Sequence, residues 1–241
     1  NFPTTPSSHD QTGGGGTNYD AVTCKLNPTL TNLDWGTYLG GAGSEAGYSV
    51  RVDEVNNKTF ICGGTESSGL ATAGVIDNSY AGGVDGYIAK FDNANGTLDA
   101  FTYLGNGSYN QAFILEIDED QDVFVYGQTI GAYPIVNAVY SQANGAQFIH
   151  KMDNDLSTTF FSTTFGSGNS GSRIDISPTA FLVDNCGNIY VSGWGDEAGG
   201  VGSTDGMDVT GDAIDGNTQG DDFYFAVIER DAQSLLYGTF F

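Results

Sequence analysis

The chain has 241 residues and a formal net charge of −23 at pH 7, from 30 acidic and 7 basic residues. A surface of that sign repels polyanions, which excludes nucleic acid as a partner, and no run approaches the ~20 apolar residues of a membrane-spanning helix, which excludes direct membrane insertion. With 36 glycines, 13 tyrosines and 15 phenylalanines, the composition favours many short strands joined by tight turns over long helices.

The first predicted strand is residues 20–26, a run that carries Lys25, and a second strand ends in Thr-Tyr-Leu-Gly at residues 37–40. From residue 42 onward, four kinds of strand recur in a fixed order, and a polar turn joins the first two kinds into a hairpin. The first kind is a run that closes with an apolar residue and Asp, at residues 52–53, 117–118 and 183–184, and the second is a run that ends in Gly, at residues 59–63, 123–127 and 189–193. The third kind carries Lys in its early copies and comprises residues 85–91, 146–152 and 222–228. The fourth is a Thr-aromatic run, at residues 102–105, 163–166 and 239–241.

Four short antiparallel strands in each repeat are the content of a β-propeller blade, and an isolated sheet of that size cannot bury both of its faces. The sequence therefore predicts an all-β fold, a β-propeller built of four-stranded antiparallel blades that stack on one another. We expect a partial blade at residues 1–41 and blades at residues 42–105, 106–166 and 167–241, which is two strands followed by three complete sets. About three and a half blades are fewer than the roughly four to eight that close a propeller. We therefore expect the chain to be part of a larger propeller, and the alternative is a compact four-blade closure with an incomplete edge.

Three motifs of the first unit are shared with a known repeat: Phe-Pro-Thr-Thr-Pro at residues 2–6, Lys-Leu-Asn-Pro at residues 25–28 and Thr-Tyr-Leu-Gly-Gly at residues 37–41. In these motifs the chain resembles the bacterial extracellular β-propeller repeat. The middle unit departs from the pattern, because Ala146 stands where the other copies have Asp. The last unit is similar to a narrower group, the large secreted proteins of Bacteroidetes with gliding-associated or type IX secretion sorting domains at their C-termini, through residues 185–195, 222–225 and 235–241.

This resemblance implies a secreted or cell-surface protein concerned with adhesion, surface filaments or gliding motility, and it implies no chemistry. The sequence has no Gly-x-Ser-x-Gly elbow, no His-Glu-x-x-His and no Gly-Lys-Ser/Thr phosphate loop, so we predict no enzymatic activity. We expect a non-catalytic structural and interaction module. Its expected partners are other extracellular proteins, surface glycans and further domains of the same long chain. The alternative is a glycan-binding or glycan-cleaving propeller, in which two carboxylates and an aromatic residue would converge in a pocket.

A long Gly-rich loop near the C-terminus concentrates acidic residues. Calcium accepts carboxylate and backbone oxygens in flexible geometry, so the candidate ligands of a calcium ion are Asp205, Asp208, Asp212 and Asp215. Calcium is the one cofactor that the sequence offers, and the alternative is an acidic surface loop.

Two other features are candidates for binding. The run 118–122 has aspartates at alternate positions, as a calcium loop does, but it lacks the central Gly and closing Glu, which favours a solvated hairpin turn. Trp194, between two glycines just past a strand, and Tyr133, in a loop, form the candidate ligand surface, on which a sugar ring would stack.

The repeated lysines and the cysteines are given structural roles. Lys25, Lys90 and Lys151 are expected to be outward or edge charges that suppress strand-to-strand aggregation. Cys24 and Cys62 lie in strand-like runs and are expected to be small buried hydrophobic residues, with a disulfide between them as the alternative.

Overall fold

The computed structural model describes residues 2–14, 18–168 and 173–241, and these residues form short β-strands with a single 3-10 helix, η1 (Arg230–Ala232). The strands make one two-stranded and three four-stranded sheets, and every pairing is antiparallel. The first sheet contains β1 (Ala21–Leu26) and β2 (Leu33–Leu39), and the second contains β3 (Glu45–Asp53), β4 (Lys58–Thr65), β5 (Asp85–Asp92) and β6 (Leu98–Leu104). The third sheet contains β7 (Tyr109–Ile117), β8 (Val123–Ile130), β9 (Gln147–Met152) and β10 (Thr159–Phe165), and the fourth contains β11 (Ser177–Val183), β12 (Ile189–Trp194), β13 (Phe223–Ile228) and β14 (Leu235–Phe240).

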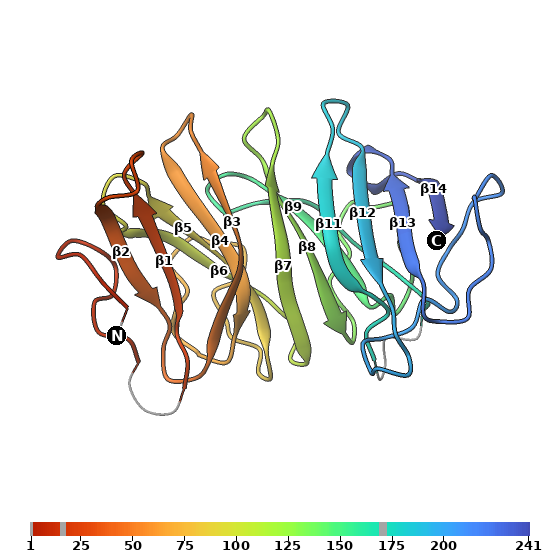
Figure 1. Ribbon diagram of the computed structural model, residues 1–241, viewed down its shortest axis with the longest axis horizontal. Coiled ribbons are helices and arrows are strands. Elements are labelled where there is room, and N and C mark those ends of the chain that lie inside the picture. The colour runs from red at the N-terminus through yellow and green to blue at the C-terminus, as the bar shows by residue number, and fades with distance from the viewer. Residues whose placement is uncertain (1, 15–17, 169–172) are drawn as a thin grey trace.

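The strands within each sheet follow one another in space in the same order as along the chain. This confirms the predicted all-β class and the predicted two strands followed by three sets of four. Figure 1 shows the four sheets side by side in chain order, with the first and the fourth at opposite ends of the row. Within the described residues, no helix has the length and apolar character needed to cross a membrane.

Aspartates open the turns between the first and second strands of the four-stranded sheets. Oδ1 of Asp118 accepts hydrogen bonds from the backbone N–H groups of Asp120 and Asp122, at 3.0 and 2.9 Å. Asp53 and Asp184 accept turn amides in the same way. The short polar side chain thus replaces the backbone acceptor that the turn lacks. The solvated turn predicted for residues 118–122 is confirmed.

A steric reason explains the glycine that ends each second strand. Opposite it, the first strand of each four-stranded sheet carries a β-bulge, seen as a register shift in β3, β7 and β11. The bulge brings a carbonyl oxygen so close that a Cβ atom on Gly127 would overlap the oxygen of Gln111. A Cβ atom on Gly63 or Gly193 would meet the oxygen of Ala46 or Ser177 in the same way. Only glycine leaves room for the bulged neighbour.

A buried threonine holds a loop along the outer edge of each sheet. The hydroxyl of Thr102, on β6, accepts a hydrogen bond from the N–H of Asp77 at 3.0 Å and donates one to the carbonyl oxygen of the same residue at 3.3 Å. Thr37 and Thr239 make the same pair of bonds to Asp10 and Asp215. Thr163 donates to the carbonyl oxygen of Tyr140. The loop that precedes each third strand therefore covers the edge of the fourth strand, which would otherwise be free to pair with another chain.

Adjacent sheets pack face to face. We call the face of a sheet that is directed toward the next sheet along the chain its forward face, and the opposite face its rear face. The forward face of the second sheet contributes Phe60, Ile88 and Leu104 to an apolar core whose other half is the rear face of the third sheet, with Phe148 and Met152. Equivalent cores lie between the first and second sheets and between the third and fourth sheets. The hydrophobic interior is thus divided into three layers between sheets.

The sheets approach one another most closely at their first strands. β7 lies against β3 and also against β11, the first strands of the sheets on either side. The fourth strands β6, β10 and β14 make no comparable contact with one another in the described part of the chain. Successive sheets are therefore wedged, with their first strands together and their fourth strands apart.

The three cysteines are unpaired. Cys62 is fully buried, as predicted, and its thiol lies 3.2 Å from the carbonyl oxygen of Ala112. Cys24 is exposed, so the expectation that it is buried is wrong. Its side chain alternates onto the rear face of the first sheet, which no other sheet in the described residues covers and on which Phe2 lies beside Tyr38.

Replacing Gly127 by alanine will destabilise the fold, because the new methyl group overlaps backbone rather than a movable side chain. We expect a loss of about 1–3 kcal/mol in the free energy of unfolding, measured by urea denaturation. Gly211→Ala is the matched control, since a Cβ atom there meets nothing within 4 Å. Equal midpoints for the two variants would contradict the steric role of the bulge.

Replacing Thr102 by valine keeps the shape of the side chain but removes the hydroxyl, which leaves the N–H of Asp77 without its partner, while the carbonyl oxygen of Asp77 keeps the hydrogen bond from the N–H of Tyr103. We expect unfolding at lower urea concentration, corresponding to about 1–3 kcal/mol, together with faster hydrogen exchange in residues 72–77. Thr29→Val, at an exposed turn position, is the control. Unchanged exchange in the loop would show that the hydroxyl does not hold it.

Candidate functional site

The four predicted calcium ligands lie in the loop between β12 and β13 and do not converge. Asp205 and Asp212 are exposed, while Oδ2 of Asp208 accepts a hydrogen bond from the hydroxyl of Tyr140 at 3.2 Å. Asp215 accepts the backbone N–H of Asn217. Across the described ranges, no three His, Cys, Asp or Glu side chains are grouped so that they could hold a metal ion. The calcium site stays a prediction without geometric support.

Tyr133 is a core residue and does not belong to a ligand surface. Its ring stacks on Phe148 at a centroid distance of 4.2 Å, and its hydroxyl lies 2.9 Å from Nδ1 of His150. Only 6% of Tyr133 is exposed, because the loop after β8 folds back into the layer between the second and third sheets. The predicted pairing of Tyr133 with Trp194 is therefore not formed, since Trp194 ends β12 in the fourth sheet.

His150 is enclosed between two hydroxyl groups. Its Nδ1 faces Tyr133, and its Nε2 lies 2.8 Å from Oγ1 of Thr159. Burial lowers the pKa of His150 to about 4, because a charged imidazolium in this layer would be desolvated without a counter-ion. His150 is thus a neutral hydrogen-bonded core residue, at a position where the other copies of the repeat have Cys24, Ala89 and Ala226.

The repeated lysines join neighbouring sheets. Nζ of Lys25 donates to the carbonyl oxygen of Asn93 at 3.1 Å, and Nζ of Lys90 donates to that of Asn154 at 3.0 Å. Each lysine reaches from its third strand to the turn between the third and fourth strands of the next sheet. Lys151 instead forms ion pairs inside its own sheet, with Asp118 and Asp122.

The prediction that these lysines are outward charges is wrong for Lys90 and Lys151, which are buried. Their aliphatic stems cross the packed layer while the ammonium groups reach polar atoms at its rim. Nζ of Lys151 also lies 4.9 Å from the ring centroid of Phe124, within the range of a cation–π contact.

The forward face of the fourth sheet is an uncovered apolar surface. In the second and third sheets, β5 and β8 are buried at all but the last residue, because both faces are covered. In the fourth sheet, burial alternates along β12 and β13, so only the rear face is covered. By alternation and register, the side chains that share the uncovered face are Leu182, Tyr190, Ser192, Trp194, Phe223, Phe225, Val227, Tyr237 and Phe241, and none of these carries a charge.

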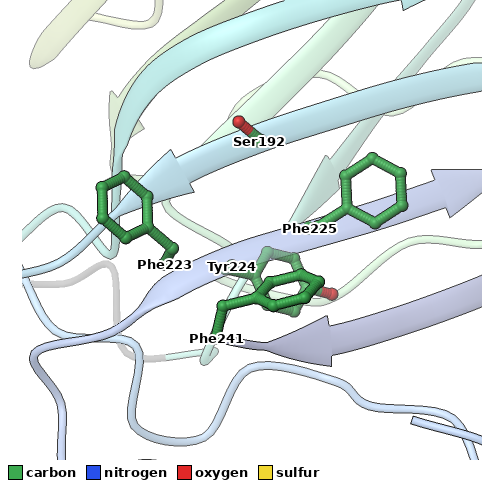
Figure 2. Close-up of a pocket in the computed structure, with 5 residues that line it drawn as sticks. All are labelled: Ser192, Phe223, Tyr224, Phe225 and Phe241. Atoms are coloured by element: carbon green, nitrogen blue, oxygen red, sulfur yellow. The ribbon is translucent and has the colours of Figure 1, made fainter. Parts of the chain in front are cut away.

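The aromatic side chains on this face border a groove of about 440 Å³. Figure 2 shows Ser192 on β12, Phe223 and Phe225 on β13, and Phe241 just past β14. Phe223 and Phe241 exchange two backbone hydrogen bonds, which places their rings at the same end of the sheet. They are 57% and 61% exposed, whereas Phe165, which occupies the position of Phe241 in the third sheet, is 1% exposed. The open face therefore presents to solvent the positions that the other sheets bury.

A search of protein families finds no model that matches this sequence, and no curated protein matches it significantly.

Sequence reasoning singled out Trp194 on this face and missed its neighbours. Two signals in the third strand of the last unit could have identified them. Phe223 and Phe225 stand at positions that hold small or aliphatic residues in the second unit, Gly86 and Ile88. Val227 also replaces the lysine of the other copies, so the fourth sheet has no cation with which to reach the next sheet.

Stability will fall as the pH is lowered from about 6.5 toward 4, because the unfolded chain binds a proton on His150 before the folded chain does. The contribution of neutral His150 to the free energy of unfolding is complete above about pH 6.5. It is lost progressively as the pH falls to the pKa of His150 in the folded chain, by up to about 3 kcal/mol. The measurement is the free energy of unfolding as a function of pH.

The control is His150→Gln, which keeps hydrogen-bonding capacity but does not titrate. Its stability should change less between pH 6.5 and 4.5 than that of the unaltered protein. Parallel pH profiles for the two proteins would exclude His150 as the source.

Proposed function

We propose that the chain is a section of a β-propeller. The observation that carries this proposal is that one junction, a forward face packed on a rear face, is repeated at all three boundaries between sheets with equivalent residues. A repeated head-to-tail contact applies the same rotation at each step, and such contacts generate rings when the rotation closes. The wedge between successive sheets, with their first strands together, supports rotation about an axis beside β3, β7 and β11.

We propose further that this section is a non-catalytic interaction module of a secreted or cell-surface protein, of the kind that serves adhesion or surface filaments. The resemblance to the extracellular Bacteroidetes repeats supports this role, and so does the acidic, Gly-rich composition. The loops that precede the third strands are fixed to the fourth strands at residues such as Asp77 and Asp215, and exposed residues beside these anchors, such as Asn78 and Gly216, can contact partners.

Glycan binding is the second candidate. Trp194 is paired in register with Phe223, and both side chains lie on the open forward face beside Phe225. Phe223 is exposed and Trp194 and Phe225 are half-buried, and adjacent aromatic rings that reach solvent are suited to stacking on sugar rings. Retention on a glycan array that is lost in Trp194→Ala would favour this candidate over a protein partner.

Antibodies against the chain should label intact, unpermeabilised cells of the source organism or detect the protein in the culture medium. Particles purified from that material should show the sheets arranged around a common axis in electron micrographs, because the junctions repeat one rotation.

Protease added to intact cells should remove the surface label while a cytoplasmic marker protein survives. Retention of the protein inside intact cells would contradict the extracellular role, and a flat sandwich without radial units would contradict the propeller.

A further inference from the structure

A groove of about 350 Å³ lies at the end of the second sheet where β3 begins and β4 ends. It opens between the second sheet and the segment that leads into β1, at a junction whose two sheets both belong to the described chain. The rings of Tyr19 and Tyr48 and the side chains of Glu45, Glu66 and Gln111 border it. The groove therefore combines two aromatic surfaces with two acidic groups.

The fold fixes the two rings from outside the groove. Phe113 of the third sheet stacks on Tyr48, with 4.8 Å between the ring centroids and 14° between the ring planes. The carbonyl oxygen of Tyr19 accepts a hydrogen bond from the N–H of Glu45 at 2.6 Å, which holds Tyr19 beside the start of β3. Tyr19 and Tyr48 are nevertheless 77% and 45% exposed, so a ligand can reach them.

The two carboxylates differ in their surroundings. Glu45 is buried, and its carboxylate accepts hydrogen bonds from the hydroxyl of Thr65 at 2.8 Å and from the N–H of Gly41 at 2.9 Å. The carboxylate of Glu66 is exposed and has no hydrogen bond or ion pair with any other described residue. Among the described residues, no lysine, arginine or histidine borders the groove. Its negative charge is therefore not compensated by the protein.

Elsewhere the chain holds an ammonium group with the same combination of side chains. Nζ of Lys151 lies 3.2 Å from Asp118 and 3.0 Å from Asp122. It also lies 4.9 Å from the ring centroid of Phe124 and 5.6 Å from that of Phe160. Two rings and two carboxylates thus surround a cation in the third sheet, and the groove offers the same kinds of group to a cation from outside the chain.

We infer that this groove binds an organic ammonium ion, with the positive charge near Glu66 and the attached carbon atoms against Tyr19 and Tyr48. The ring faces and the carboxylate both attract such a charge, and the net charge of −23 concentrates cations at the surface. A neutral sugar would gain nothing from the uncompensated charge, and a bare metal ion would find no group of three acidic side chains in the described ranges.

The ammonium group has two possible sources with one chemistry, a small quaternary amine or the lysine side chain of a polypeptide. The site lies apart from the Trp194 face. It goes beyond the proposed function, because it requires neither a closed propeller nor a location outside the cell.

The first experiment is calorimetric titration of the full chain with choline and with the uncharged isostere of choline, in which a quaternary carbon replaces the nitrogen. We expect a dissociation constant of about 0.1–1 mM for choline and binding at least about tenfold weaker for the isostere. Raising NaCl from about 20 to about 300 mM should weaken the binding of choline by screening. Equal affinities for the two probes, or no binding of choline at about 10 mM, would overturn the inference.

The second experiment changes one group of the site at a time. Glu66→Gln and Tyr19→Leu should each weaken the binding of choline about three- to tenfold, whereas Tyr19→Phe keeps the ring and should bind nearly as the unaltered chain does. Both positions are exposed, so the fold should not change. Glu54→Gln is the matched control, because it removes the same charge at an exposed position beyond the other end of β3. Equal losses in Glu66→Gln and Glu54→Gln would show an effect of net charge alone and contradict the site.

Nuclear magnetic resonance locates the bound probe. Choline should shift the amide signals of Ser44, Ala46 and Gly64, which border the groove, and leave the indole signal of Trp194 unchanged. Shifts confined to Trp194 and its neighbours would overturn the assignment of the groove.

A comparison of choline with Nα-acetyllysine amide distinguishes the two sources. Tighter binding of choline indicates a small quaternary amine, and tighter binding of the lysine derivative indicates a polypeptide. If neither compound binds while a neutral oligosaccharide shifts the signals of the groove, the site is a glycan site and the inference is wrong. That result would leave the surface-labelling test of the proposed function unaffected.

Discussion

A small antiparallel sheet has two faces, and its own strands can cover neither of them. In this protein the second and third sheets have large apolar side chains on both faces, such as Phe60 and Tyr87 or Phe124 and Phe148, and all four are buried. The second and third sheets therefore depend on a neighbour at each face, and the contact of one forward face with one rear face is the interaction on which the other features depend. The side chains of Lys25 and Lys90 add polar links between neighbouring sheets at the rim of these layers.

The strands and their grouping could be predicted because they depend on local patterns that recur. Alternation of apolar residues, turn aspartates and the closing glycines are each visible within ten residues of sequence, and four copies of one ending fix the order. What could not be predicted is which side chains a neighbouring sheet covers. Cys24 and Ala89 occupy the same position in their strands, yet Cys24 is exposed and Ala89 is buried, because only the second sheet has a sheet behind it.

The same limit explains the errors at the candidate site. Tyr133 follows a strand in a loop, where exposure is the usual state, but the loop enters a layer between sheets. A lysine in a strand indicates an edge or a solvated face when the strand is considered alone. Lys90 contradicts this because its hydrogen-bond acceptor, the carbonyl oxygen of Asn154, lies 64 residues further along the chain.

The departure of the middle unit from the repeat has a compensation in the structure. In the second sheet, the carboxylate of Asp85 accepts the N–H of Ala81 at 2.6 Å, and burial raises the pKa of Asp85. In the third sheet Ala146 replaces that aspartate, and Asp175, which lies just before β11, accepts the N–H of Ala146. A carboxylate is therefore present at the edge of both sheets, although a different residue supplies it, Asp85 in one case and Asp175 in the other.

The edge threonines fix loops of different length to their sheets in the same way. The loops between second and third strands span residues 66–84, 131–146 and 195–222, so they differ in length, yet each comes back to its fourth strand at a threonine hydroxyl. Selection can therefore exchange the exposed residues of a loop, whereas residues such as Tyr133 and Met207, which enter the layers between sheets, are constrained by packing. Exposed loop residues are therefore the positions at which evolution could change binding specificity, or at which a binding peptide could be grafted, with little effect on the stability of the fold.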